Sequence, residues 1–173
     1  MVAAGAIRDG AEAHHGTRFE GSDEPQPRKH VFGFVADLGS GTGMLALGSS
    51  LLDASLSIGF EIDEDALKIA KNNADEMEIA NVDFLACDVL TTAVDDIRLH
   101  KAFDTVIMNP PFGTKKNAGM DVKFLKIASQ LSRSRIYSLH KTSTRAFIQR
   151  KATELNFEEA EVIAELRYNL DSS

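Results

Sequence analysis

An apolar run that ends in a glycine-rich turn constrains the fold of this chain more than any other feature. Residues 31–36 are apolar or glycine, which is typical of a parallel strand buried on both faces of a sheet. The turn 37–43 (DLGSGTG) follows, and a helix is predicted over residues 44–52, with Leu45, Gly48 and Leu52 facing the sheet. Glycines let the backbone turn tightly and approach a ligand without side-chain clash. Strand, glycine turn and helix together predict the opening of a nucleotide-binding βαβ unit.

The rest of the chain alternates between strand and helix patterns. Asp63 supplies an N-cap for the second helix. Further strands are predicted at residues 55–60, 82–86, 103–108, 135–139 and 160–166, and further helices at about 64–77, 121–131 and 142–155. With right-handed crossovers, this alternation predicts an α/β fold with a doubly wound, mostly parallel sheet.

The composition is that of one globular domain. The chain has 173 residues, enough to bury a core, and no apolar run approaches the roughly 20 residues that cross a bilayer. Residues 1–30 show no hydrophobic period, so we predict a disordered tail over 1–30 and one domain over 31–173. The first residues lack the pattern of a secretory signal. The single cysteine, Cys87, excludes an internal disulfide and a cysteine-based zinc site, which suits a reducing intracellular compartment.

Charge is distributed unevenly along the chain. The formal net charge is −7, yet segment 113–151 contains ten Lys or Arg against one acid, Asp121, and carries +9. Such a segment is often only a solvated face. Here it begins just after the predicted strand 103–108, where Lys115 and Lys116 could contact the phosphates of a nucleic acid.

Acidic residues end the two strands that follow the glycine turn. Glu61 ends the second strand and Asp88 the third, so both are predicted to lie with the turn on the carboxyl rim of the sheet. A solvated strand-end role is the simpler alternative for each acid. The turn, Gly39-x-Gly41-x-Gly43, is neither the dinucleotide fingerprint nor a Walker loop. Its compact form suits S-adenosylmethionine, with Glu61 reaching the ribose, Asp88 the base, and both acids favouring the positive charge.

The predicted strand 103–108 ends in Asn109-Pro110-Pro111-Phe112. Prolines cannot continue a central sheet ladder, and the residue before a proline is extended, so Asn109 is predicted to project from the rim. A loop with a hydrophobic plug would have the same composition. Beside S-adenosylmethionine, the Asn109 and Pro110 carbonyls could accept the N–H groups of an exocyclic amine and direct its lone pair at the methyl group. Phe112 would stack on a base swung out of its strand.

These motifs resemble those of the class I S-adenosylmethionine-dependent methyltransferases with an Asn-Pro-Pro-Phe motif, which have a Rossmann-like fold. More narrowly, segments 37–41, 59–66, 103–115 and 137–141 are similar to the methyltransferase-like protein 5 family, over about residues 33–170. The resemblance implies N6-methylation of adenine in small-subunit ribosomal RNA, in the nucleus and the cytoplasm. It also implies a heterodimer with a small zinc-binding activator protein that pairs along a sheet edge.

The resemblance further implies the roles of individual residues. Gly39, Thr42 and Met44 would lie against the methionine part of the cofactor with Gly41 in the same turn, Glu61 on the ribose, and Asp88 and Val89 on the adenine. The catalytic motif would be Asn109, Pro110, Pro111 and Phe112. Position 61 is usually Asp in that family. The family's helical segment before the first strand and its final hairpin after residue 170 are not recognisable here, which predicts a sheet truncated at its C-terminal edge and weakened cofactor affinity.

Two other functions remain open. Related motifs serve amino-methyltransferases of DNA adenine and of protein glutamine; the basic segment favours nucleic acid, and the lack of a separate DNA-reading domain favours RNA. A non-catalytic module that keeps only the fold and the activator partner is the second alternative. The presence of Asn109 and Phe112 argues against that module, whereas the unrecognisable N-terminal helical segment and final hairpin argue for it.

Overall fold

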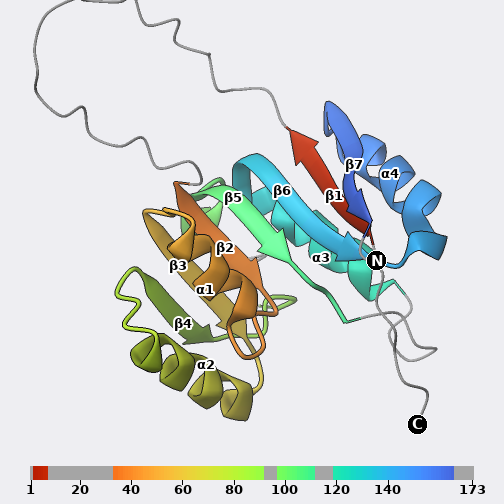
Figure 1. Ribbon diagram of the computed structural model, residues 1–173. Helices are drawn as coiled ribbons and strands as arrows, with labels where there is room; N and C mark the ends of the chain where they lie inside the picture. Colours follow the sequence, from red (N-terminus) through yellow and green to blue (C-terminus); the bar gives the residue numbers. More distant parts are fainter. Residues whose placement is uncertain (1, 8–32, 92–96, 112–118, 166–173) are drawn as a thin grey trace, which may run out of the picture.

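The described residues form a seven-stranded sheet in the order β4-β3-β2-β5-β6-β1-β7 (Figure 1). The structure, a computed structural model, describes residues 2–7, 33–91, 97–111 and 119–165. Neighbouring parallel strands make up most of the sheet: β4 (Val82–Ala86), β3 (Leu56–Glu61), β2 (Phe34–Leu38), β5 (Phe103–Met108) and β6 (Ser132–His140). β1 (Val2–Ile7) lies between β6 and β7 (Glu159–Glu165) and is antiparallel to both.

Helices cover the two faces of the sheet as right-handed crossovers require. α1 (Met44–Leu51) and α2 (Glu64–Glu76) pack against β2, β3 and β4. On the other face, α3 (Met120–Leu131) packs against β5 and β6, and α4 (Arg145–Glu154) against β7 and α3. Figure 1 shows α1 and α2 in front of the sheet and α3 behind it. Single 3₁₀ turns, η1 (Ile97–Leu99) and η2 (Thr142–Thr144), precede β5 and α4. The predicted α/β, mostly parallel class is confirmed.

The core lies on the central strands. Leu38, Val106 and Met108 have no exposed surface, and they join Phe60 and Phe103 in one apolar cluster. The two phenylalanine rings meet edge to face with centroids 5.9 Å apart. Each side chain of this size contributes about 1.5–3 kcal/mol on burial. This packing holds the carboxyl ends of β2, β3 and β5 in fixed positions, and those ends carry the candidate site.

Most strand and helix boundaries agree with the sequence predictions, and β4 and β5 have the predicted bounds. The buried face of α1 was predicted wrongly. Ala46 and Leu47 are buried against the sheet, whereas Leu52, predicted to face it, follows the helix and is 63% exposed. The Ala46 N–H donates to Oδ2 of Asp37 at 2.9 Å, and this bond sets the rotation of the first helical turn.

The N-terminal residues also differ from prediction. A disordered tail was predicted over residues 1–30, but Val2–Ile7 form β1, which pairs along its length with β6 and with β7. Residues 8–30 lie outside the described part of the chain. The sequence VAAGAI contains few β-branched and no aromatic residues, so propensity did not indicate a strand. Backbone hydrogen bonding to two neighbours supplies what the side chains do not.

In the described ranges, no helix is long and apolar enough to span a bilayer, and no group of three or more His, Cys, Asp or Glu side chains is arranged to hold a metal ion.

Candidate active site

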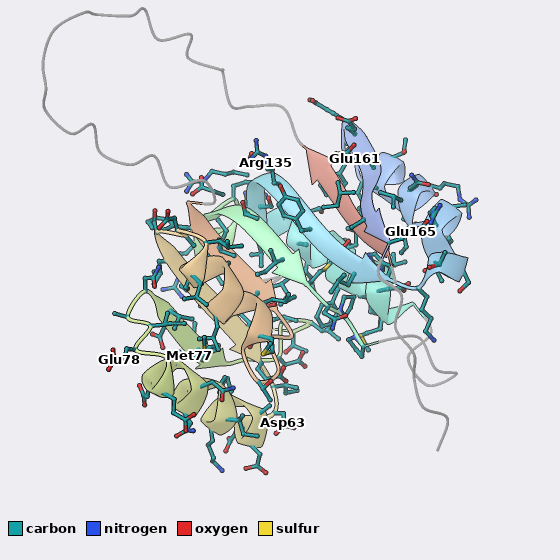
Figure 2. The ribbon with its side chains drawn as sticks, in the orientation of Figure 1. Asp63, Met77, Glu78, Arg135, Glu161 and Glu165 are labelled. Carbon is teal, nitrogen blue, oxygen red and sulfur yellow. The ribbon has the colours of Figure 1, made fainter. Side chains whose placement is uncertain are left out.

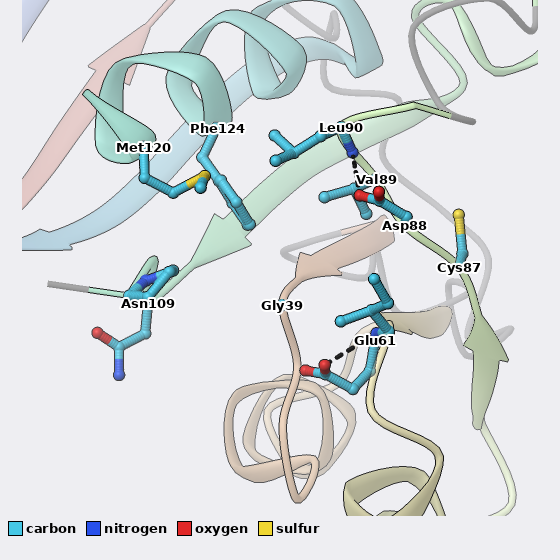
Figure 3. Close-up of a pocket in the computed structure, with 11 residues that line it drawn as sticks. Gly39, Glu61, Cys87, Asp88, Val89, Leu90, Asn109, Met120 and Phe124 are labelled. Atoms are coloured by element: carbon cyan, nitrogen blue, oxygen red, sulfur yellow. Dashed lines mark hydrogen bonds between the residues drawn. The ribbon is translucent and has the colours of Figure 1, made fainter. Parts of the chain in front are cut away.

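A cavity of about 460 Å³ opens at the carboxyl ends of the parallel strands. Figure 3 shows it between the glycine turn after β2, the ends of β3, β4 and β5, and the first turns of α3. Six residues that were predicted to contact cofactor or substrate line it: Gly39, Glu61, Asp88, Val89, Asn109 and Pro111. The structure therefore brings together on one rim the strand ends that the sequence analysis grouped.

The glycine turn is held against the end of β3. The N–H groups of Gly39 and Ser40 donate to the Phe60 carbonyl at 2.8 and 3.1 Å. Gly43 has φ of 86°, and a Cβ there would lie 2.8 Å from the Phe84 ring of β4. A side chain at this position would both strain the backbone and displace the ring. Glycine at position 43 thus allows the turn to pack closely against the Phe84 ring.

Glu61 is fixed by three backbone amides. Its Oε2 accepts from Gly41 at 2.7 Å, and its Oε1 accepts from Ile62 at 2.8 Å and from Asp63 at 3.0 Å. Charge-assisted bonds of this kind orient a carboxylate strongly. Oε1 already accepts two bonds, but Oε2 accepts only one and has a second lone pair, so Glu61 can still accept from a hydroxyl in the cavity.

Asp37 lies behind the turn and is 1% exposed. Its Oδ2 accepts from Ala46, while Oδ1 has no hydrogen-bond partner in the described structure. Burial raises the pKa of the Asp37 carboxyl to about 7; the Ala46 bond opposes the rise, and the charge of Glu61 adds to it. A buried, unpaired carboxylate oxygen is costly, and a cation placed near the turn would relieve that cost.

Asn109 projects from the end of β5 and is exposed. Figure 3 shows it on the far side of the cavity from Glu61 and Asp88. Pro110 is buried, whereas Pro111 is exposed and lines the cavity. Met108 pairs with Ser138 in the register of β5 and β6, so Asn109 starts from a fixed strand end. The amide is thus open to a substrate that enters from solvent.

Other predicted site residues lie outside the cavity lining. Gly41 contacts Glu61 from within the turn. Thr42 is exposed, and its carbonyl accepts from the Asn73 side chain of α2 at 3.0 Å. Met44 begins α1 and is 71% exposed. Phe112, Lys115 and Lys116 lie outside the described residues.

Sequence reasoning missed the apolar wall of the cavity. Met120 and Phe124, one helical turn apart on α3, line it together with Leu90, Ile62 and Cys87. Phe124 also touches the glycine turn, since a Cβ on Gly39 would lie 3.3 Å from its ring. The apolar spacing of 120, 124, 128 and 131 was the available signal, but the sequence does not state which helix residues reach the rim.

The doubly wound sheet, with a glycine turn, strand-end acids and an Asn-Pro-Pro corner around one cavity, defines a methyltransferase-class α/β domain. Sequence comparison agrees: the model of the methyltransferase small domain matches residues 25–135. The chain belongs to this family and, within it, to the METTL5 family.

The chain is 53% identical over 139 residues to the rRNA N(6)-adenosine-methyltransferase Mettl5 of Drosophila melanogaster, covering 80% of this chain and 64% of that protein. It is also 53% identical to METTL5 of Danio rerio, covering 80% and 65%. The chain therefore spans about two thirds of the length of these relatives. Among solved structures, a putative RNA methyltransferase from Pyrococcus horikoshii is 35% identical with a TM-score of 0.57, covering 70% of this chain and 58% of that one.

Methyltransferases of this family use S-adenosylmethionine, and the site fits it. The unpaired Oδ1 of Asp37 and the fixed carboxylate of Glu61 suit a cationic ligand with ribose hydroxyls. The apolar wall of Val89, Leu90 and Phe124 suits a flat base.

Proposed function

We propose that this domain transfers a methyl group from S-adenosylmethionine to the exocyclic N6 of an adenine in ribosomal RNA. The observation that carries the proposal is the position of Asn109, which lines the same cavity as Gly39, Glu61 and Asp88. The names of the 53% identical relatives support the choice of ribosomal RNA adenine.

Each side of the cavity has a part in this proposal. Asp37 and the glycine turn would hold the methionine end of the cofactor, Glu61 its ribose, and Asp88 with Val89 its adenine. When bound, S-adenosylmethionine supplies an electrophilic methyl group on a sulfonium. The exposed Asn109 amide then faces the acceptor from the opposite side of the cavity.

The acceptor amine is a weak nucleophile because its lone pair is delocalised into the ring. The Asn109 side-chain carbonyl and the Pro110 backbone carbonyl each accept a hydrogen bond from one N–H group of this amine, which directs the nitrogen lone pair at the methyl group. Methyl transfer would form the N–C bond as the S–C bond breaks, and the nitrogen would then lose a proton to solvent. The residues mainly position the reactants, an effect that can supply roughly 7–11 kcal/mol.

Methyl transfer to a ribosomal RNA oligonucleotide tests the proposal, with the adenine replaced by guanine as the substrate control. Asn109→Ala should lower kcat by roughly 10²–10³-fold, on the scale of losing a polar contact made at the reacting centre, while cofactor affinity stays within about twofold. Lys71→Ala on the exposed face of α2 is the matched control. Equal activity of Asn109→Ala and the native chain would refute the catalytic role.

We propose small-subunit ribosomal RNA as the target. We also propose that the protein acts in the nucleus and the cytoplasm, and imaging of a tagged chain tests this localisation. Large-subunit RNA, DNA and a glutamine-bearing peptide belong in the same assay, because methylation of any of these in preference would replace the RNA proposal. Methyl transfer to none of them, with cofactor bound, would favour the non-catalytic module.

A small zinc-binding activator is the proposed partner, bound along β4. This strand is an outer edge of the sheet, and Leu85 on it is 44% exposed, with Ile69 and Met77 of the α2 segment each 50% exposed. Unpaired strand edges with apolar neighbours are sites of strand addition. Leu85→Glu should prevent co-purification of the activator, whereas Leu51→Glu on α1 should not; retention by Leu85→Glu would place the partner elsewhere.

A further inference from the structure

Over β6, β1 and β7, one face of the sheet has no described helix packed extensively on it. On β6, alternate residues Ile136, Ser138 and His140 are buried at 1%, 4% and 3% exposure, and Ile136 joins the core that includes α3. Since side chains alternate along a strand, Arg135, Tyr137 and Leu139 face the other way. On that side, α1 and α2 pack against β2, β3 and β4, and none of the described helices packs extensively on β6, β1 and β7. Figure 1 shows α3 behind β6, and α1 and α2 in front of other strands of the sheet.

The residues of this open face form three rows across the strands. The register through β1 aligns Arg135 of β6 with Glu159 of β7, Tyr137 with Glu161, and Leu139 with Ala164. On β7, Ala160 packs toward the core with α4, so Glu159 and Glu161 face away from that helix. The open face therefore has a basic and aromatic side on β6 and an acidic side on β7, with β1 between them.

Such a pattern is complementary to itself. A two-fold axis parallel to β1 would place β6 of one copy over β7 of the other. Arg135 would then meet Glu159, the Tyr137 hydroxyl would meet the Glu161 carboxylate, and Leu139 would lie over the small Ala164. Glu159 and Glu161 are both exposed, so they would repel a nucleic acid or an acidic membrane. Figure 2 shows Arg135 and Glu161 near the same end of the sheet, on strands either side of β1.

We propose that the open face of β6, β1 and β7 binds a second copy of this chain in an isologous, face-to-face dimer. Sheets pack face to face about 10 Å apart, which accommodates Tyr137 and Leu139 opposite smaller residues. Three strands give a small contact, at the low end of specific interfaces, so the dimer is expected to be weak and reversible. β4 lies at the opposite edge and stays accessible. The dimer does not depend on the proposed methyl transfer.

Sedimentation velocity of the full chain, from about 1 to 200 µM, tests this dimer. We expect a concentration-dependent shift from monomer to dimer. Arg135→Glu should weaken self-association at least about tenfold, because it places like charges opposite Glu159. The double variant Arg135→Glu with Glu159→Arg should restore it, since both members of each pair are exchanged. Lys126→Glu, the same charge change on an exposed position of α3, should leave it unchanged.

The exchanged charges lie at exposed positions, so a loss of the dimer in these variants would not be caused by unfolding of the chain. Arg135 and Glu159 are exposed, so neither single change should unfold the chain, and circular dichroism confirms that. A chain that stays monomeric over the whole concentration range overturns the proposal. So does a dimer that responds equally to Arg135→Glu and Lys126→Glu, or one that the double variant does not restore.

Discussion

The backbone N–H of Gly41 donates a 2.7 Å hydrogen bond to Oε2 of Glu61. This bond joins the glycine turn after β2 to the end of β3. The same carboxylate accepts from Ile62 and Asp63, so one side chain organises the backbone of two adjacent strand ends. Glu61 is therefore a candidate cofactor-binding residue, and it also holds the glycine turn against the end of β3.

Replacing Glu61 by Ala should weaken S-adenosylmethionine binding by at least about tenfold, because three amides lose a charged acceptor and the turn loses its tie to β3. Glu61→Gln keeps one acceptor oxygen and should bind with intermediate affinity. Isothermal titration calorimetry on the native chain measures this and tests the weakened affinity that the sequence predicts. Equal affinity of Glu61→Ala and the native chain would show that the hydrogen bonds of the Glu61 carboxylate are not needed for cofactor binding.

Asp37→Asn should stabilise the ligand-free chain at pH 8. The Asp37 carboxyl has a folded pKa of about 7 against an ordinary value of 3.8. The folded chain therefore binds more protons than the unfolded chain between these values, so the free energy of unfolding falls as pH rises through that window. Above pH 7 the buried charge costs on the order of 4 kcal/mol. Asn keeps the oxygen that accepts from Ala46 and carries no charge.

Urea unfolding of both chains at pH 4 and pH 8 checks this prediction. The stability difference should be small at pH 4 and favour Asp37→Asn at pH 8. A difference that does not change with pH would mean that the pKa of Asp37 is not raised in the folded chain. Asp53→Asn, at an exposed position after α1, is the matched control.

Binding of S-adenosylmethionine should release a proton near pH 6.5. A cation beside the unpaired Oδ1 of Asp37 stabilises the carboxylate and lowers its pKa, so a carboxyl that is partly protonated in the ligand-free chain ionises on binding. Calorimetry in two buffers with different ionisation enthalpies measures the proton count. The release should vanish at pH 9 and in Asp37→Asn; an undiminished release in that variant assigns it to another group.

Gly59→Ala should destabilise the chain by about 1–3 kcal/mol. A Cβ at Gly59 would lie 2.5 Å from the Phe84 ring and 2.8 Å from Oγ of Ser40, so the ring that supports the glycine turn has to move. Gly48→Ala is the control: it lies inside α1 with nothing within 4 Å of its Cβ and should stabilise by about 0.5–1 kcal/mol. Thermal unfolding measures both changes in stability, which should be negative for Gly59→Ala and positive for Gly48→Ala. Gly59→Ala at native stability would show that Phe84 repacks without cost.

Much of the candidate site was predictable because its residues end strands. β4 is bounded by Asn81 and Cys87 and β5 ends before Pro110, so local pattern located both strands. In a parallel sheet, the carboxyl ends meet at one rim, which places Glu61, Asp88 and Asn109 around one cavity. Their functional roles stay predictions that the experiments above test.

The sequence by itself determined the succession of strands and helices along the chain, the glycine turn and the polar rim, because apolar runs and turn residues act over a few neighbouring positions. Only the tertiary structure decided that VAAGAI is a strand, that Met120 and Phe124 wall the cavity, and which face of α1 is buried. β1 has weak propensity and forms because β6 and β7 both offer backbone partners to it. Contacts between distant segments depend on how the whole chain packs, and local pattern does not contain that information.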